Sequence, residues 1–155
     1  MDAYLILKTI HVISATILFG TGLGIAFFFL MGLRSADVAG AWFAARTTAL
    51  ADMLFTLTAG IVQPLSGFGL IHLARWDPWS PWLAWTYAIY LLALACWLPV
   101  VWLQLRMRDM LGAKVAGEAI DAARLRRCFR WWFALGWPAF VGLVAVFWLM
   151  VAKPA

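Results

Sequence analysis

Four long apolar stretches alternate along the chain with shorter segments that carry most of its polar and charged residues. The apolar stretches cover residues 4–33, 50–74, 82–105 and 131–151. A helix needs about 20 predominantly apolar residues to cross the hydrocarbon core of a bilayer, and each stretch meets that length. The pattern therefore predicts an all-α protein, a four-span transmembrane helical bundle that forms one domain over residues 1–155.

Composition supports a membrane protein and excludes several other classes. Hydrophobic residues make up 66% of the chain and charged residues 12%, which is far more apolar than a soluble domain. The net charge of +5 comes from basic residues in loops beside a membrane surface, so the bilayer is the expected partner and nucleic acid is not. Cys96 and Cys128 form neither a CxxC pair nor a CxxCH site for covalent haem.

The distribution of basic residues predicts the orientation of the bundle. Nine of the 12 Lys and Arg residues lie in or beside the two segments that join the first span to the second and the third to the fourth. By the positive-inside rule these segments face the cytoplasm. Both termini and the connection RWDPWSP (residues 75–81) are then expected outside the cytoplasm.

The two connections with informative sequences have different expected structures. RWDPWSP is expected to be a tight interfacial turn, because its prolines interrupt helices and its tryptophans favour the headgroup zone. Residues 106–130 are rich in helix-forming residues, so we expect the third and fourth spans to extend beyond the membrane and to turn near Gly112 to Gly117.

His11 is the first candidate for a functional residue. It lies about two turns inside the first span, next to Lys8 in the cluster KTIH, and ionisable groups at membrane depth are unfavourable enough to mark functional sites. The predicted topology places His72 in the same outer half of the bundle, within about one turn of its boundary. For His72, a position at the membrane interface without a function and a role as a ligand are equally favoured. For His11, a functional role is favoured. The alternative for His11 is a neutral imidazole hydrogen-bonded to a neighbouring helix.

Small and polar residues mark further candidate positions in the first two spans. Gly20 and Gly24 form a GxxxG pair in the first span, and Gly67 lies in the second span. Glycine permits the close approach of another helix or of a flat cofactor, and helix packing is the favoured interpretation of these glycines. Asp52 is expected to pair with Arg46, with a role in proton relay as the alternative. Pro64 is expected to kink the second span before His72.

Haem is the cofactor that these residues favour. A neutral imidazole is the usual axial ligand of haem iron, and helical bundles hold cofactors on side chains of facing helices. We therefore expect haem b with His11 as an axial ligand and His72 as the candidate second ligand. A copper path would show Met or Cys clustered at helical spacing, which the chain lacks. Hydrolase chemistry has no support, because the sequence shows no nucleophile with an adjacent base, no phosphate loop and no HExxH.

Several segments resemble a known family over nearly the whole chain. The opening YLILKTIHVISATILFGTGLGIAFFF, the central QPLSGFGLI, CWLPVVWLQLRMRD and the closing FALGWPAFVGLVAVFWLMVAKP resemble the uncharacterised bacterial integral-membrane family DUF2269. The chain is more distantly similar to the HemJ-type protoporphyrinogen oxidases and to the copper-resistance D membrane proteins. That wider resemblance implies a compact helical protein of the bacterial inner (cytoplasmic) membrane that binds haem b, with His11 matching the histidine of the HemJ-type opening motif.

Three hypotheses of function follow. The first is a membrane-bound b-type haem protein for electron transfer, working with a redox partner protein and as a candidate homodimer. The second is a HemJ-like enzyme of tetrapyrrole oxidation with Lys8 near the substrate. The third is a cofactor-free bundle for assembly or for transport of a metal or small molecule. Whether the chain is an enzyme stays open among the three.

Overall fold

The computed structural model describes residues 2–154 and is helical throughout this range apart from short connections. The elements in chain order are α1 (Ala3–Arg34), α2 (Val38–Ala51), the π-helical turn η1 (Asp52–Thr56), α3 (Leu57–Ala74), α4 (Pro81–Val115) and α5 (Ala122–Ala152). Because α2, η1 and α3 are continuous, the described residues form four helical segments that are long and apolar enough to cross a membrane. The prediction of an all-α, four-span protein is confirmed.

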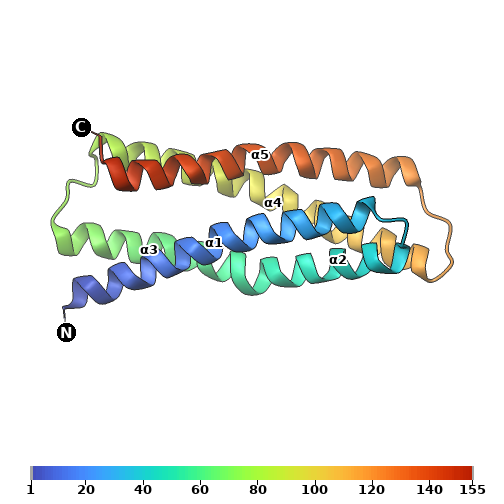
Figure 1. Ribbon diagram of the computed structural model, residues 1–155. Helices are drawn as coiled ribbons and strands as arrows, with labels where there is room; N and C mark the ends of the chain where they lie inside the picture. The colour runs from blue at the N-terminus through green and yellow to red at the C-terminus, as the bar shows by residue number, and fades with distance from the viewer. Residues whose placement is uncertain (1, 155) are drawn as a thin grey trace.

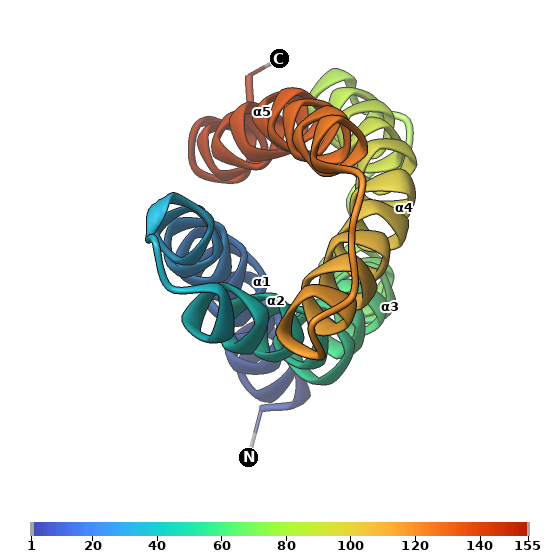
Figure 2. The same cartoon turned by 90° about the vertical axis from the view of Figure 1, so that its right-hand side faces the viewer.

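The four segments run antiparallel along one axis. Figure 1 shows both termini at the same end as the α3–α4 connection, and the α1–α2 and α4–α5 connections at the other end. Seen along the axis in Figure 2, the helices form an arc in the order α5, α4, α3 and α1, with α2 beside α1. Aromatic contacts join the two ends of this arc, since the Phe19 ring stacks on Phe140 of α5 at 4.9 Å between centroids.

Local sequence explains where the helices begin. The carboxylates of Asp2, Asp37 and Asp121 each accept a hydrogen bond from a backbone N–H in the first turn of α1, α2 and α5, which is the usual N-cap arrangement. α4 begins at Pro81, whose fixed φ suits the first helical position. The second helical segment begins at Val38 instead of Leu50, because Asp37 caps an alanine-rich sequence of high helix propensity.

Both connections lie near their predicted positions. α4 extends to Val115 and α5 begins at Ala122, so the turn between them lies at residues 116–121, slightly later than the predicted Gly112 to Gly117, with Gly117 at a φ of 85° that suits glycine. Trp76 of the α3–α4 connection meets the ring of Trp82, in the first turn of α4, edge to face at 5.5 Å between centroids. The Lys153 ammonium lies 4.1 Å from the centre of the Trp76 ring and ties the C-terminal end of α5 to this connection.

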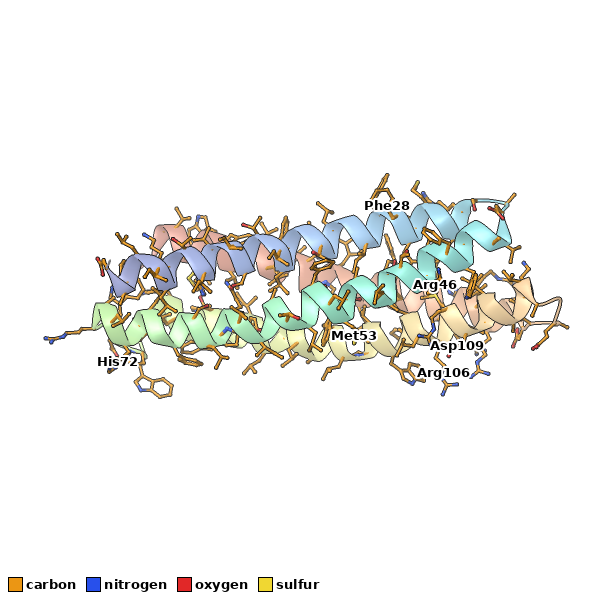
Figure 3. The ribbon with its side chains drawn as sticks, turned by 90° about the horizontal axis from the view of Figure 1, so that it is seen from below. Phe28, Arg46, Met53, His72, Arg106 and Asp109 are labelled. Carbon is orange, nitrogen blue, oxygen red and sulfur yellow. The ribbon has the colours of Figure 1, made fainter. Side chains whose placement is uncertain are left out.

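The bundle is apolar outside as well as inside. Phe29 and Met107 are fully buried and pack with Trp132 in the core of the end that carries the α1–α2 and α4–α5 connections. Large apolar side chains such as Phe28 project outward from the bundle (Figure 3). An apolar exterior of this kind suits lipid as the surrounding solvent.

Candidate functional site

His11 forms a hydrogen-bond network between α1 and α3. Its Nδ1 lies 2.8 Å from Ser66 Oγ, and its Nε2 lies 3.2 Å from Gln63 Nε2. The Ser14 hydroxyl, one turn along α1, donates to Gln63 Oε1. We call these four residues the His11 network; it satisfies polar groups that would otherwise face hydrocarbon.

The geometry of this network assigns the histidine tautomer. The Ser66 hydroxyl donates to the Val62 carbonyl at 2.7 Å, so its oxygen accepts from His11 Nδ1–H. His11 Nε2 then carries the lone pair and accepts from the Gln63 amide. A neutral imidazole hydrogen-bonded to a neighbouring helix, the alternative interpretation of His11, is thus the arrangement in this structure.

Glycine allows α3 to approach α1 beside this network. A Cβ placed on Gly67 would lie 3.3 Å from His11 Cε1, and one placed on Gly69 would lie 2.6 Å from Leu7 Cδ2. The expectation that Gly67 permits close packing agrees with this geometry, and the group that it approaches is His11 itself.

Gly20 and Gly24 differ from Gly67 in this respect. No described atom outside the local helix lies within 4 Å of a Cβ placed on either residue. Within the described part of this chain, neither glycine of the GxxxG pair is in close contact with another helix, so the packing role of the pair stays a prediction.

His72 and Lys8 do not converge on His11. His72 is exposed and follows Gln63 by nine residues, which at roughly 100° per residue places it on the opposite face of α3. Figure 3 shows His72 at the end of α3, on the side away from α1. Lys8 is exposed, and its ammonium lies 5.8 Å from the centre of the Tyr4 ring. Within residues 2–154 no three His, Cys, Asp or Glu side chains gather as a metal site would require.

A cavity of about 580 Å³ lies between the helices, further along the bundle from the His11 network. α1, η1, α3, α4 and α5 all contribute to its walls. Most lining residues are apolar, and the aromatic ones are Phe19, Tyr90, Trp97, Trp132, Phe133, Trp137 and Phe140. His11 is not among the lining residues, whereas Gly22 and Gly136 are.

Polar side chains line this cavity at η1 and α4. Trp97 Nε1 lies 3.5 Å from Asp52 Oδ1, and Thr56 and Gln104 lie beside the same carboxyl group. These four residues are called the Asp52 cluster. Among the described atoms, Asp52 Oδ2, Thr56 Oγ1, Gln104 Oε1 and the nearby cavity atom Trp132 Nε1 are buried without a hydrogen-bond partner. Unsatisfied polar atoms are rare in protein interiors and call for an explanation.

Asp52 does not pair with Arg46 as the sequence predicts. The Arg46 guanidinium lies 5.1 Å from the centre of the Trp42 ring, and Arg46 is exposed. Arg108 and Asp109 form the ion pair found among residues 2–154. The carboxyl group of Asp52 faces Trp97 and Gln104 of α4 instead, so the expected pairing is wrong.

Tyr90 completes the polar lining. Pro64 has no amide hydrogen, so the carbonyl of Gly60, four residues earlier, has no α-helical donor. The Tyr90 hydroxyl of α4 donates to this carbonyl. The pair therefore fixes α4 against α3 at the cavity wall.

The cavity residues of α4 and α5 are not predicted from the sequence. Tyr90, Trp97, Gln104 and Trp132 lie in apolar stretches, and they line one cavity with Asp52 only through the packing of the helices. One available indication was Gln104, since a polar amide in a predicted span is a candidate by the same argument that singled out His11.

Comparison with known proteins places the chain in a family. No curated protein matches it, and no solved structure does. The distant resemblance to HemJ-type oxidases and copper-resistance D proteins therefore stays a prediction. The family model described as "Predicted integral membrane protein (DUF2269)" matches residues 5–154. The chain belongs to this family of integral membrane proteins.

Proposed function

We propose that the protein binds a membrane-soluble small molecule inside its helical bundle. The observation that carries this proposal is the cavity of about 580 Å³, with apolar walls and buried polar atoms that no described residue satisfies. Ligand sites are typically cavities of roughly 300–1,000 Å³, mostly apolar with a few polar groups that orient the ligand. A bound molecule would fill the apolar volume and provide partners for the polar atoms.

The bilayer is the proposed source of this molecule. The helices that line the cavity are long and apolar enough to span a membrane. At the wall between α1 and α5, Gly22 and Gly136 contribute no side chains. An apolar ligand dissolved in the lipid would reach this wall without crossing water.

Filling the cavity tests the proposal. Gly22 lines the cavity and a Cβ placed there meets no atom within 4 Å, so Gly22→Leu is expected to occupy the ligand volume without a clash. Gly20→Leu is the matched control, because Gly20 has equally open surroundings but does not line the cavity. Native mass spectrometry of protein released from its own membranes should show a retained small molecule in the wild type and in Gly20→Leu, but not in Gly22→Leu. Equal occupancy in both variants, or no retained molecule in the wild type, contradicts the proposal.

Haem b bound through His11 is the second candidate. A specific observation favours it, since ligating histidines usually donate their other ring N–H to a fixed acceptor, as His11 Nδ1–H does to Ser66. Nε2 is the nitrogen that would bind iron, and the Gln63 amide, 3.2 Å away, would have to move aside. Haem would supply one-electron redox chemistry, and both electron transfer to a partner and HemJ-like oxidation depend on it.

His72 does not fit as a second ligand in this arrangement, because it is exposed on the opposite face of α3. The haem candidate therefore rests on His11 alone among the histidines. Purified protein expressed with haem precursor should show a Soret band that His11→Ala removes and His72→Ala leaves unchanged. A colourless wild-type preparation excludes this candidate and leaves the cavity proposal standing.

A further inference from the structure

Three buried oxygen atoms of the Asp52 cluster have no hydrogen-bond partner among the described residues. Asp52 and Gln104 are each 2% exposed and Thr56 is 8% exposed. Their unpartnered atoms, Oδ2, Oε1 and Oγ1, are all oxygens, and all three residues line the cavity. The Thr56 hydroxyl can donate as well as accept, whereas a carboxylate and an amide oxygen only accept hydrogen bonds. Asp52 Oδ2 and Gln104 Oε1 therefore favour a donor or a positive charge beside them.

The protein does not provide that charge from within the cavity. The lining contains no Lys, Arg or His among the described residues. The guanidinium group of Arg46 lies over the Trp42 and Phe43 rings of the same helix, α2. Arg108 of α4 forms an ion pair with Asp109. Trp97 Nε1–H donates to Asp52 Oδ1, but no cationic side chain of the described lining neutralises the carboxylate. A buried charge without a counter-ion is strongly unfavourable.

The remaining walls suit a cation with a large apolar body. Tyr90, Trp97, Trp132 and Trp137 line the cavity together with three phenylalanines. Aromatic faces attract positive charge, most strongly when it is removed from water. The same walls bury apolar atoms, and the unpaired Trp132 Nε1–H suits a hydrogen-bond acceptor elsewhere on the ligand.

We propose that the ligand of this cavity is a lipophilic organic cation whose positive charge is held by Asp52. Thr56 and Gln104 lie beside the same carboxyl group, and the aromatic residues of the cavity surround the apolar part of the cation. This inference rests on the proposed function, because it specifies the chemistry of the molecule that the cavity binds. The π-helical turn contributes directly, since both Asp52 and Thr56 belong to η1.

The test measures binding of tetraphenylphosphonium and of neutral triphenylphosphine oxide to the full chain in lipid nanodiscs. The wild type is expected to bind the cation at least tenfold more tightly than the neutral compound. Asp52→Asn keeps the shape of the side chain without its charge, and it should reduce the affinity for the cation at least tenfold. Asp109→Asn is the matched control, because Asp109 is exposed and outside the cavity, and it should leave the affinity unchanged.

The outcomes separate this inference from the proposed function. Equal affinity for the cation and the neutral compound, both lost in Gly22→Leu, overturns the cation assignment and retains a cavity that binds apolar molecules. Unchanged cation affinity in a folded Asp52→Asn protein also overturns it. If the wild type binds neither tetraphenylphosphonium nor triphenylphosphine oxide, both proposals are contradicted. The comparison of the two compounds uses only the wild type, so it tests the preference for a cation even if Asp52→Asn fails to fold.

Discussion

Tyr90 of α4 donates a hydrogen bond to the backbone carbonyl of Gly60 on α3. Pro64 has no N–H, so this carbonyl lacks the donor that it would have in a regular α-helix. The tyrosine of α4 replaces the hydrogen bond that the proline of α3 removes. In a bilayer, water is absent as a substitute partner, and backbone groups freed by proline are satisfied by neighbouring helices.

Tyr90→Phe should therefore destabilise the bundle by about 1 kcal/mol, because the Gly60 carbonyl would lose its partner. Tyr87→Phe is the matched control: it lies on the same helix, and its buried hydroxyl has no partner among the described residues. Unfolding in mixed micelles with increasing sodium dodecyl sulfate, followed by tryptophan fluorescence, measures the difference. Equal destabilisation by both changes would show that the hydroxyl–carbonyl bond contributes no stability.

Gly67→Leu should weaken the packing of α3 on α1. Its side chain would enter space that His11 occupies, since a Cβ at this position already lies 3.3 Å from His11 Cε1. Overpacking of this kind typically costs roughly 1–3 kcal/mol. The same unfolding assay applies, with Gly20→Leu as the control in open surroundings. A Gly67→Leu protein as stable as the wild type would mean that the two helices separate without loss.

Both termini are expected outside the cytoplasm. The fold places them at one end of the bundle (Figure 1), and the basic residues Arg34 and Arg124 lie at the other end, which the positive-inside rule assigns to the cytoplasm. Alkaline phosphatase fused to the C-terminus should be active, and green fluorescent protein at the same position should not fluoresce. The reverse pattern would show that the basic end faces outward.

Asp121 should make the stability of the bundle depend on pH. The backbone N–H of Arg124 is the main group that lowers the pKa of this exposed carboxyl group below its usual value of 3.8, and the N–H of Ala123 adds to the effect. Because the folded-state pKa is the lower one, the stabilisation is complete above the usual aspartate range and is lost as the pH falls through the folded-state pKa.

The change to test is Asp121→Asn, which retains an N-cap oxygen without a titratable proton. Melting temperatures in detergent between neutral pH and about pH 3 should show the wild type losing its advantage over Asp121→Asn as the carboxyl group is protonated. The expected shift is a small one because the group is exposed. A constant difference between the two proteins across this range would argue against the linkage.

The sequence predicts the spans of this protein well and its cavity poorly. Hydrophobic length alone identifies four spans, because a bilayer imposes one requirement on every transmembrane helix. His11 is also identifiable, since a polar residue at depth must have a partner. Its actual partners are harder to predict: Gln63 and Ser66 are visible as polar residues of the second span, but their contact with α1 depends on the rotation of α3 about its axis.

Asp52 illustrates the remaining difficulty. Arg46 lies six residues earlier on a regular α-helix, which places the two side chains about 120° apart, and Asp52 faces Trp97 and Gln104 of α4. The ion pair is thus excluded by regular helical periodicity, since the π-helical turn begins only at Asp52. The pattern of apolar and polar residues does not predict a π-helical turn.

The π-helical turn has a consequence for the phase of everything that follows it along the second span. In η1 the Leu57 amide donates to the Asp52 carbonyl, five residues earlier, whereas an α-helix would use a donor four residues away. The turn thus accommodates one surplus residue. Deleting a single residue from η1 would remove this surplus and restore a regular α-helix, and α3 would keep its rotational phase. Ser66 would still face His11, and the Gly60 carbonyl would still face Tyr90. A second deletion, with no surplus residue left to absorb it, is predicted to rotate α3 by roughly 100° and to disconnect it from both of its neighbours at once, although it removes none of the side chains that join them.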